Sequence, residues 1–305
     1  MKTIKNVLIC GLGGLGCICA SHIQKYKTAQ IKVLVDKSRY EKYLNTETYF
    51  NDEPFKFDVI LPEEKNYKAD LIIIATKYDG LDFAIKGIKN FIKSNTIIIS
   101  LLNGISSEEL IAEKYGWNNI ILSFYIGHSC IRKGRNIQQD GNYKLILGER
   151  NNSTNNNKLK ELANFFEESK INYKISEKFI DEYWQKFMIN VGLNQLCATT
   201  GLELKEIRKD PKLVEQLKHL MKEVENIAEK QGLYHHKEIY EAAEKFLLKE
   251  MENAHPSMLQ DIEEKRKTEV EIFAGTVIEL GKKFNVKTPE NINIYNKILE
   301  IENSY

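Results

Sequence analysis

Three polar side chains recur at helical spacing within an otherwise apolar segment. Lys186, Asn190 and Asn194 follow one another at intervals of four residues in the run EYWQKFMINVGLNQ, so a helix would carry all three along one face. A buried polar atom without a partner costs about 1–3 kcal/mol. Either other side chains satisfy this row, or it faces a cleft and binds a polar ligand. We favour the cleft, where desolvation would lower the pKa of a lysine toward neutrality and suit it to donate a proton.

A second group of residues is suited to binding a dinucleotide. A glycine-rich loop of the pattern Gly-x-Gly-x-x-Gly follows a short apolar run and precedes a segment of helical periodicity. In such loops the first glycine permits a tight turn, the second lets the backbone approach a pyrophosphate, and the third lets helix and strand pack closely. The phosphates would lie on the N–H groups at the helix N-terminus. The predicted loop consists of Gly11, Leu12, Gly13, Gly14, Leu15 and Gly16.

The choice between NAD and NADP depends on the residues that follow the second predicted strand. Asp36 stands 20 residues after Gly16, where an acid accepts a hydrogen bond from the 2′-hydroxyl of NAD and repels the 2′-phosphate of NADP. Arg39 is close enough in the sequence to accommodate that phosphate instead. Alternatively, the charges of Lys37 and Arg39 belong only to a solvated turn. The residues therefore leave the choice open.

Two more polar residues follow buried strands. Lys77 comes after the apolar run 70–76, and Asn103 after the run 96–102. The ligands of open α/β sheets bind at the carboxyl ends of parallel strands, so we interpret both residues as ligand-binding. The alternatives are a solvated lysine and a turn asparagine.

Two helix-start patterns mark the last third of the chain. Ser257 with Gln260, and Thr268 with Glu271, have the spacing of a capping box. They predict two helices with a bend between them, so that Ser257 would offer a hydroxyl and helix N–H groups to a carboxylate. Glu269, in the first turn of the second helix, would then reach the reacting centre. Both residues are equally well explained as simple helix starts.

The elements that position these residues predict an α/β half followed by an all-helical half. We therefore expect a dinucleotide-binding domain over 1–177 and a helical domain over 178–305. The predicted strands cover 7–10, 31–35, 70–76, 96–102, 120–125, 128–135, 143–148 and 171–175. The predicted helices cover 15–26, 79–92, 107–115 and 159–168, then 179–197, 211–231, 237–252, 257–261 and 268–284.

Composition and charge exclude several classes of function. The chain of 305 residues carries 44 basic and 43 acidic residues, which leaves no electrostatic footprint for nucleic acid and no basic membrane patch. No apolar run approaches the ~20 residues that span a bilayer. Five cysteines suggest reduced thiols and a cytoplasmic location, and the histidines have no metal-ligand spacing. We therefore expect no nucleic-acid partner, no membrane association and no metal. No heptad seam demands pairing, so a homodimer stays open.

Together these motifs resemble one family, the ketopantoate reductases (2-dehydropantoate 2-reductases) of pantothenate biosynthesis. The resemblance runs through both halves of the chain in the same order. The segments that carry it are the glycine loop, Ala75-Thr76-Lys77, Asn103-Gly104, Trp184-x-Lys186-x-x-x-Asn190-x-x-x-Asn194, Ser257-Met-Leu-Gln-Asp261 and Thr268-Glu269.

The resemblance implies a Rossmann-type domain followed by an all-α domain like the C-terminal domain of 6-phosphogluconate dehydrogenase. It also implies reduction of ketopantoate to pantoate, with Lys186 as the proton donor and Glu269 in contact with the cofactor and the reacting centre. Asn190, Asn194 and Ser257 would hold the 2-oxo acid. Lys77 and Asn103 would lie by the nicotinamide ribose, where Asn103 also meets the substrate.

The chain departs from the family pattern at two places. The family generally uses NADPH, often with an arginine just after the second strand, where this chain has Asp36. We therefore expect NADPH, with NADH open. Some members carry an asparagine shortly before the serine, where this chain has Ala254 beside Asn253. The alternatives to ketopantoate reduction are reduction of another branched 2-oxo acid and a non-catalytic dinucleotide sensor.

Overall fold

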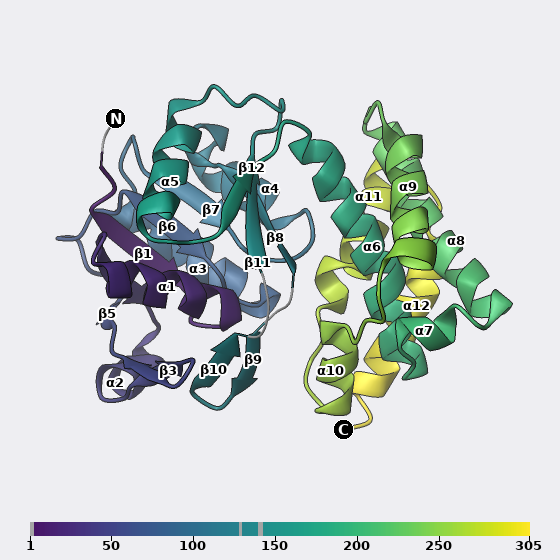
Figure 1. The fold of residues 1–305 in the computed structure, drawn as a ribbon, viewed down its shortest axis with the longest axis horizontal. Helices are drawn as coiled ribbons and strands as arrows, with labels where there is room; N and C mark the ends of the chain where they lie inside the picture. Colours follow the sequence, from purple (N-terminus) through teal and green to yellow (C-terminus); the bar gives the residue numbers. More distant parts are fainter. Residues whose placement is uncertain (1–2, 128–129, 140–142) are drawn as a thin grey trace. The chain divides into compact units, whose positions relative to one another are not determined.

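The computed structural model describes residues 3–127, 130–139 and 143–305. The chain divides into two compact units, which follow the colours of Figure 1 from purple to teal and from teal to yellow. The first unit comprises Met1–Asn103 and Ser107–Ile180, and the second comprises Gly104–Ser106 and Asp181–Tyr305.

A five-stranded parallel sheet forms the centre of the first unit. Its strand order is β5-β2-β1-β6-β7, and Ile9 of the central strand lies opposite Val33 on one side and Ile73 on the other. Parallel sheets are covered on both faces, which explains the continuous apolar runs. The strands are β1 (Asn6–Cys10), β2 (Gln30–Leu34), β5 (Asp58–Ile60), β6 (Leu71–Ile74) and β7 (Ile97–Ser100).

The strand order creates a switch point at the centre of this sheet. From β1 the chain first builds outward through β2 and β5, then crosses back to β6 and continues to β7. The connections that leave β1 and β6 therefore run to opposite sides. Such a point leaves a crevice at the carboxyl ends of the two strands, which is where open α/β sheets bind their ligands.

The helices of the first unit connect these strands. The predicted helix over 79–92 is wrong as one element, because a 3₁₀ turn precedes a short α-helix and another 3₁₀ turn follows it. Gly80 and Gly87 weaken the helix, and a Cβ on Gly87 would lie 2.9 Å from a methyl carbon of Leu34. The elements are α1 (Gly14–Tyr26), α2 (Lys37–Leu44), η1 (Tyr78–Gly80), α3 (Leu81–Gly87), η2 (Ile88–Phe91), α4 (Ser107–Tyr115), η3 (Trp117–Asn119) and α5 (Asn157–Glu168).

Two smaller sheets complete the first unit, with strand orders β4-β3-β10-β9 and β12-β11-β8. The predicted strand over 143–148 is confirmed, and those over 120–125 and 171–175 are confirmed with shifted ends. The one over 128–135 corresponds to β9, while residues 128 and 129 lie outside the described residues. Strands β3, β4, β5 and β10, of three or four residues each, were not predicted, because they are too short to show a clear period of two. The strands are β3 (Thr48–Phe50), β4 (Glu53–Phe55), β8 (Leu122–Gly127), β9 (Cys130–Lys133), β10 (Asn136–Gln139), β11 (Tyr143–Gly148) and β12 (Tyr173–Ile175).

The second unit is helical in its described residues, as predicted. The predicted helix over 268–284 begins only at Ala274, because the backbone of Phe273 (φ −105°, ψ −89°) leaves the helical region after a 3₁₀ turn. The last helix was not predicted, although Thr288-Pro289 is a typical start. The elements are α6 (Phe179–Thr200), α7 (Leu204–Ile207), α8 (Pro211–Lys230), α9 (His236–Lys245), the π-helix η4 (Phe246–Glu250), α10 (Ser257–Glu263), η5 (Val270–Ile272), α11 (Ala274–Phe284) and α12 (Pro289–Glu302).

A buried polar network caps the first turns of two of these helices. Glu223 of α8 accepts hydrogen bonds from the backbone N–H groups of Glu290 and Asn291 at 2.8 and 3.0 Å, and so caps α12. Asn291 accepts a hydrogen bond from Gln195 of α6, whose Oε1 accepts one from the N–H of Ala274 at the start of α11. Burial raises the pKa of Glu223, against the opposing effect of its hydrogen bonds.

Two further observations concern the described residues of both units. No described helix has the length and apolar character needed to cross a membrane, and no described His, Cys, Asp and Glu side chains gather in a group suited to a metal. Burial raises the pKa of the Cys10 thiol, and that of Cys197 to about 12. These thiols therefore stay protonated at neutral pH.

The capping role of Glu223 predicts a large loss of stability in Glu223→Ala. The substitution leaves two buried backbone donors and the Asn291 amide without their acceptor, at a cost of about 3 kcal/mol in the free energy of unfolding. Urea unfolding followed by far-UV circular dichroism measures this loss. The control is Glu215→Ala on the exposed face of the same helix, which should change the value by less than about 0.5 kcal/mol. Equal effects of the two substitutions would contradict the capping role.

Candidate functional site

The glycine loop after β1 is built by close backbone approaches. Gly11 has φ +98°, and a Cβ there would lie 2.7 Å from the carbonyl oxygen of Ala75. A Cβ on Gly16 would lie 2.0 Å from the carbonyl oxygen of Gly11. Packing within the protein therefore requires these two glycines. Gly13 is different, since the nearest atom to a Cβ there would be the Ala75 carbonyl oxygen, at 3.8 Å.

The space at Gly13 lies at the N-terminus of α1. Gly13, the N-cap of this helix, has no side chain that could cap it, and the first turn contains no acidic residue. The N–H groups of a first helical turn lack partners within the helix, and they favour an anion. Contacts within the protein do not require a glycine at position 13. A glycine there is explained if a pyrophosphate approaches the backbone at this helix start. The loop therefore meets the requirements of a dinucleotide.

The other predicted residues of the first unit lie on either side of this loop along the sheet edge. Asp36 follows β2 on one side of β1, whereas Lys77 follows β6 and Asn103 follows β7 on the other side. A dinucleotide whose pyrophosphate lies on the loop would thus extend one half toward Asp36 and the other half toward Lys77. Lys77 is exposed and Asn103 half-buried.

The segment after β2 is a helix start and not a free turn. Asp36 is the N-cap of α2, and its Oδ1 accepts a hydrogen bond from the N–H of Arg39 at 2.9 Å. The Nε of Arg39 also lies 3.4 Å from Oδ2 of the same carboxylate. Asp36, which favours NAD, and Arg39, which could accommodate the 2′-phosphate of NADP, therefore form an ion pair.

The polar row predicted from the sequence lies on α6, the longest helix of the described chain. Lys186 and Asn190 are half-buried, and Asn194 is 8% exposed. Asn194 is thus the most deeply buried of the three side chains.

The opposite face of α6 is closed by packing. A Cβ on Gly192 would lie 2.9 Å from the Cγ of Met221 on α8. Gly192 is two residues beyond Asn190, and hence about 200° around the helix from it. The contact with α8 therefore leaves the polar row uncovered by that helix. Gln195, at the next position after Asn194, is occupied by the buried network described above.

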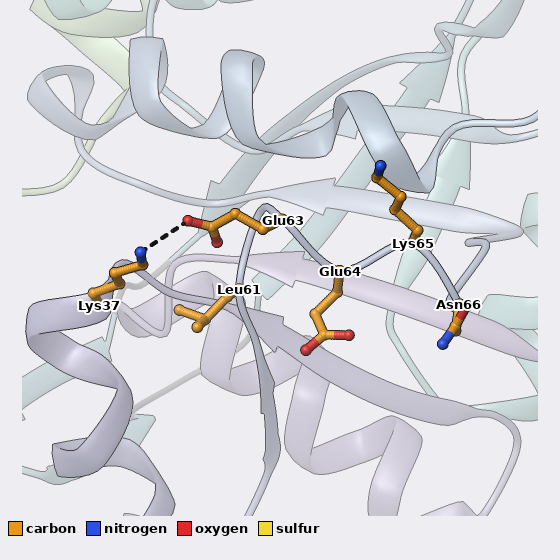
Figure 2. Close-up of a pocket in the computed structure, with 6 residues that line it drawn as sticks. All are labelled: Lys37, Leu61, Glu63, Glu64, Lys65 and Asn66. Carbon is orange, nitrogen blue, oxygen red and sulfur yellow. Dashed lines mark ion pairs between the residues drawn. The ribbon is translucent and has the colours of Figure 1, made fainter.

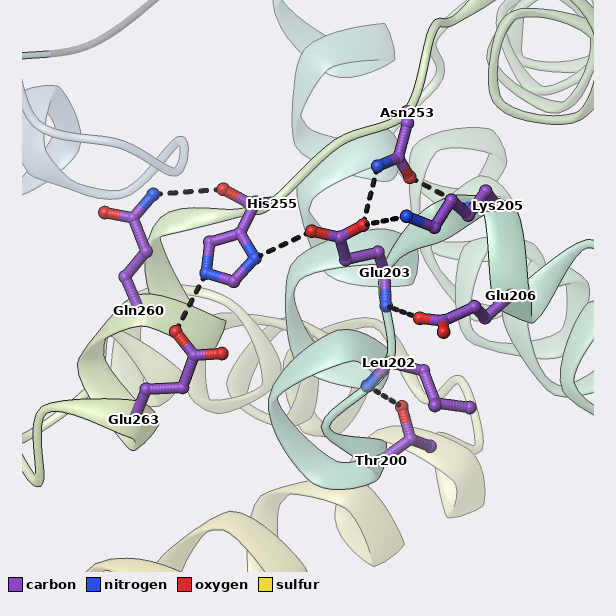
Figure 3. Close-up of polar contacts among 9 residues, drawn as sticks. All are labelled: Thr200, Leu202, Glu203, Lys205, Glu206, Asn253, His255, Gln260 and Glu263. Carbon is purple, nitrogen blue, oxygen red and sulfur yellow. Dashed lines mark hydrogen bonds and ion pairs between the residues drawn. The ribbon is translucent and has the colours of Figure 1, made fainter.

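Ser257 is the first residue of α10, and a coil of residues 251–256, here named the strap, leads into it. Figure 3 shows how Glu203 anchors the strap: its carboxylate accepts a hydrogen bond from Asn253 at 2.6 Å and contacts His255 at 3.2 Å. The other ring nitrogen of His255 lies 2.8 Å from Glu263 of α10. These contacts fix the backbone immediately before Ser257.

The contacts of Glu203 also affect its own charge. The hydrogen bond from Asn253 is the largest of several that lower the pKa of Glu203 to about 2. The side-chain amide of Asn253 is therefore bound to Glu203. The sequence signal for this anchor is Glu203-x-x-Glu206, which forms a capping box at the start of α7. Our sequence analysis did not identify it.

Neither of the predicted capping boxes forms. The N-cap of α10 is Pro256, and the side chain of Gln260 donates to the carbonyl oxygen of His255. Ser257 is thus an exposed helical residue whose hydroxyl does not cap the helix. A proline at the preceding position supplies the extended backbone that starts the helix without a side-chain cap.

Thr268 forms its hydrogen bonds with Glu302 of α12 and not with Glu271. Its N–H and its hydroxyl both donate to Oε1 of Glu302, at 2.7 and 2.6 Å. Glu271 accepts a hydrogen bond from the hydroxyl of Tyr295. Glu269 is half-buried. Its predicted position in the first turn of an α-helix is wrong, because it is the N-cap of the 3₁₀ turn η5 and α11 begins only at Ala274.

Comparisons with known proteins cover both units. A family model described as ketopantoate reductase PanE/ApbA matches residues 7–152, and the corresponding C-terminal model matches residues 178–302. The 2-dehydropantoate 2-reductase of Streptococcus pyogenes serotype M18 (strain MGAS8232) is 26% identical over 295 residues, which are 93% of each chain.

Solved structures share the fold over nearly the whole length. The ternary structure of D-mandelate dehydrogenase with NADH and anilino(oxo)acetate gives a TM-score of 0.83 at 23% identity and covers 98% of both chains. Dimeric ketopantoate reductase from Staphylococcus aureus gives 0.77 at 19% identity, over 98% of this chain and 99% of that one. The predicted fold class, a Rossmann-type domain followed by a helical domain, is confirmed. With both family models matched in order, the chain belongs to the ketopantoate reductase PanE/ApbA family.

Proposed function

We propose that this chain reduces 2-dehydropantoate (ketopantoate) to pantoate, a step of pantothenate biosynthesis, with a reduced pyridine nucleotide as the cofactor. The observation that carries the proposal is the row of Lys186, Asn190 and Asn194 on the face of α6 that α8 leaves uncovered. The family membership and the dinucleotide-binding geometry of the glycine loop support it.

In this proposal the first unit supplies the residues that hold the cofactor. The loop Gly11–Gly16 and the N-terminus of α1 bind the pyrophosphate, and Lys77 and Asn103 lie toward the nicotinamide ribose. The bound cofactor supplies a hydride to the 2-oxo carbon.

The second unit supplies the proton and most of the substrate contacts. As the carbonyl oxygen of the 2-oxo acid gains negative charge, the ammonium group of Lys186 donates a proton to it and the 2-hydroxy acid forms. Amides of Asn190 and Asn194 and the hydroxyl of Ser257 bind the carboxylate and the distal hydroxyl of the substrate, together with Asn103. Donors aimed at developing charge in a site without water typically contribute several kcal/mol each. Glu269 contacts the cofactor and the reacting centre.

A second candidate is reduction of another branched 2-oxo acid on the same scaffold. The sequence of the strap supports this candidate. Ala254 stands where some family members have a substrate-binding asparagine, and the side chain of the neighbouring Asn253 is bound to Glu203 instead. A non-catalytic dinucleotide sensor is a weaker candidate, because a sensor has no use for the row that Lys186 begins.

We also propose a cytoplasmic location and a homodimer. Cys10 and Cys197 are buried and form no disulfide, which fits a reducing compartment. The homodimer rests on the likeness to the dimeric reductase from Staphylococcus aureus.

The proposed proton transfer predicts that Lys186→Ala lowers kcat by about 10²–10⁴-fold, while the Kd of the reduced dinucleotide changes little. Lys186→Arg should be similarly impaired, since a guanidinium keeps the charge but does not release its proton. The control is Gln185→Ala, one position away on α6. Stopped-flow absorbance of the nicotinamide measures kcat, and fluorescence titration measures Kd. Turnover near wild type in Lys186→Ala would remove Lys186 from this role.

The two kinds of glycine in the loop predict different outcomes for Gly13→Ala and Gly16→Ala. Gly13 has room for a methyl group, so Gly13→Ala should keep the Tm but weaken dinucleotide binding about tenfold or more, since the methyl group takes the place of the pyrophosphate. Gly16→Ala should lower both the Tm and the binding, because its Cβ collides with the Gly11 carbonyl. Differential scanning calorimetry and fluorescence titration separate the effects. Unchanged affinity in a folded Gly13→Ala would argue against a pyrophosphate at this position.

Substrate discrimination tests the choice of 2-oxo acid. A site that hydrogen-bonds the distal hydroxyl should give ketopantoate a kcat/KM about 10⁴-fold above that of 2-oxoisovalerate, which lacks this hydroxyl. Phenylglyoxylate, the 2-oxo acid that corresponds to mandelate, is the third substrate in the series. Steady-state kinetics with all three decides the question. A preference for 2-oxoisovalerate or phenylglyoxylate would favour the second candidate.

A further inference from the structure

A shallow depression of about 450 Å³ lies at the carboxyl ends of β2 and β5. These two strands are neighbours on the side of β1 away from β6 and β7. Figure 2 shows the depression with its lining residues, which are Lys37, Leu61, Glu63, Glu64, Lys65 and Asn66. Asp36 immediately precedes Lys37, so this depression borders the place where the 2′-position of an adenosine ribose lies in Rossmann-type domains.

Each cation that follows Asp36 is already paired with a carboxylate. The Nζ of Lys37 lies 3.4 Å from Glu63, as the dashed line in Figure 2 marks, and the Nε of Arg39 lies 3.4 Å from Asp36. The carboxylate of Asp36 also accepts a hydrogen bond from the hydroxyl of Ser38. The charges of these two acids and two bases therefore cancel before any ligand arrives.

Both carboxylates are ionised at neutral pH. The hydroxyl of Ser38, followed by the N–H and the charge of Arg39, lowers the pKa of Asp36. The pKa of Glu63 is lowered by its own backbone N–H and by Lys37. A ribose hydroxyl can donate a hydrogen bond to such a carboxylate, whereas a 2′-phosphate brings further negative charge to it.

We propose that Asp36 and Glu63 together make this chain prefer NADH over NADPH: Asp36 accepts a hydrogen bond from the 2′-hydroxyl, and Glu63 holds Lys37 away from a 2′-phosphate. The inference rests on the proposed function, since it concerns the dinucleotide of the same site. All four side chains are at least one-third exposed. Solvent screens such charges, so the preference should be about tenfold and not absolute.

The test is the Kd of NADH and of NADPH for the full chain, measured by fluorescence titration without substrate. The wild type should bind NADH about tenfold more tightly. Glu63→Gln releases Lys37 and should improve NADPH binding about threefold, with NADH binding within about twofold of wild type. Asp36→Asn keeps the helix cap, because asparagine caps as well as aspartate, but should bring the two Kd values to within about twofold of each other.

The matched control is Glu53→Gln, which removes another exposed carboxylate paired with a lysine, Lys25, in the same unit. It should leave the ratio of the two Kd values unchanged. A wild type that binds NADPH as tightly as NADH, or a ratio that neither Glu63→Gln nor Asp36→Asn changes, would overturn the inference and leave the proposed function standing. If the wild type binds neither dinucleotide, the proposed function fails and the inference fails with it.

Discussion

The site in the first unit depends on the contact between two glycines at the tip of β1. The Cα of Gly16, in the first turn of α1, lies so close to the carbonyl oxygen of Gly11 that no side chain fits between them. This contact starts the helix directly at the end of the strand, beside the end of β6. Because the same turn places the N-terminus of α1 at the sheet edge, one packing constraint shapes both the strand–helix connection and the proposed pyrophosphate site.

The helical unit carries a polar row within a largely apolar bundle. The two faces of α6 therefore have different surroundings. Gly192 lets α8 pack closely on one side, and Gln195 joins the buried network that caps α11 and α12. Polar groups of the network satisfy one another, and the row that begins at Lys186 lies outside this network. Contacts of the strap with Glu203 fix the backbone immediately before Ser257.

The exposed edge near Asp36 shows how charge pairs can limit a ligand without closing a pocket. Lys37 and Arg39 are each close to a carboxylate, so these two pairs offer a hydroxyl donor an acceptor but offer a phosphate little uncompensated positive charge. Exposed pairs of this kind add little to stability. Their proposed effect on which dinucleotide binds follows from position, because the residues after the second strand of a Rossmann-type domain lie by the 2′-position, where NADH and NADPH differ.

The sequence by itself determined the order of the elements and the positions of the glycine loop and of the polar row on α6, because these depend on local periodicity and on spacing within one element. Strands β3, β4 and β5 were not predicted, since they are too short to show a period of two. The late start of α11 at Ala274 and the start of α10 after Pro256 depend on the local backbone conformation, which the capping-box spacing did not reveal. Only the tertiary structure showed that Gly13 has room whereas Gly11 and Gly16 have none, and that Glu63 pairs with Lys37. Those facts join residues far apart in the chain, and no spacing along the sequence encodes such distances.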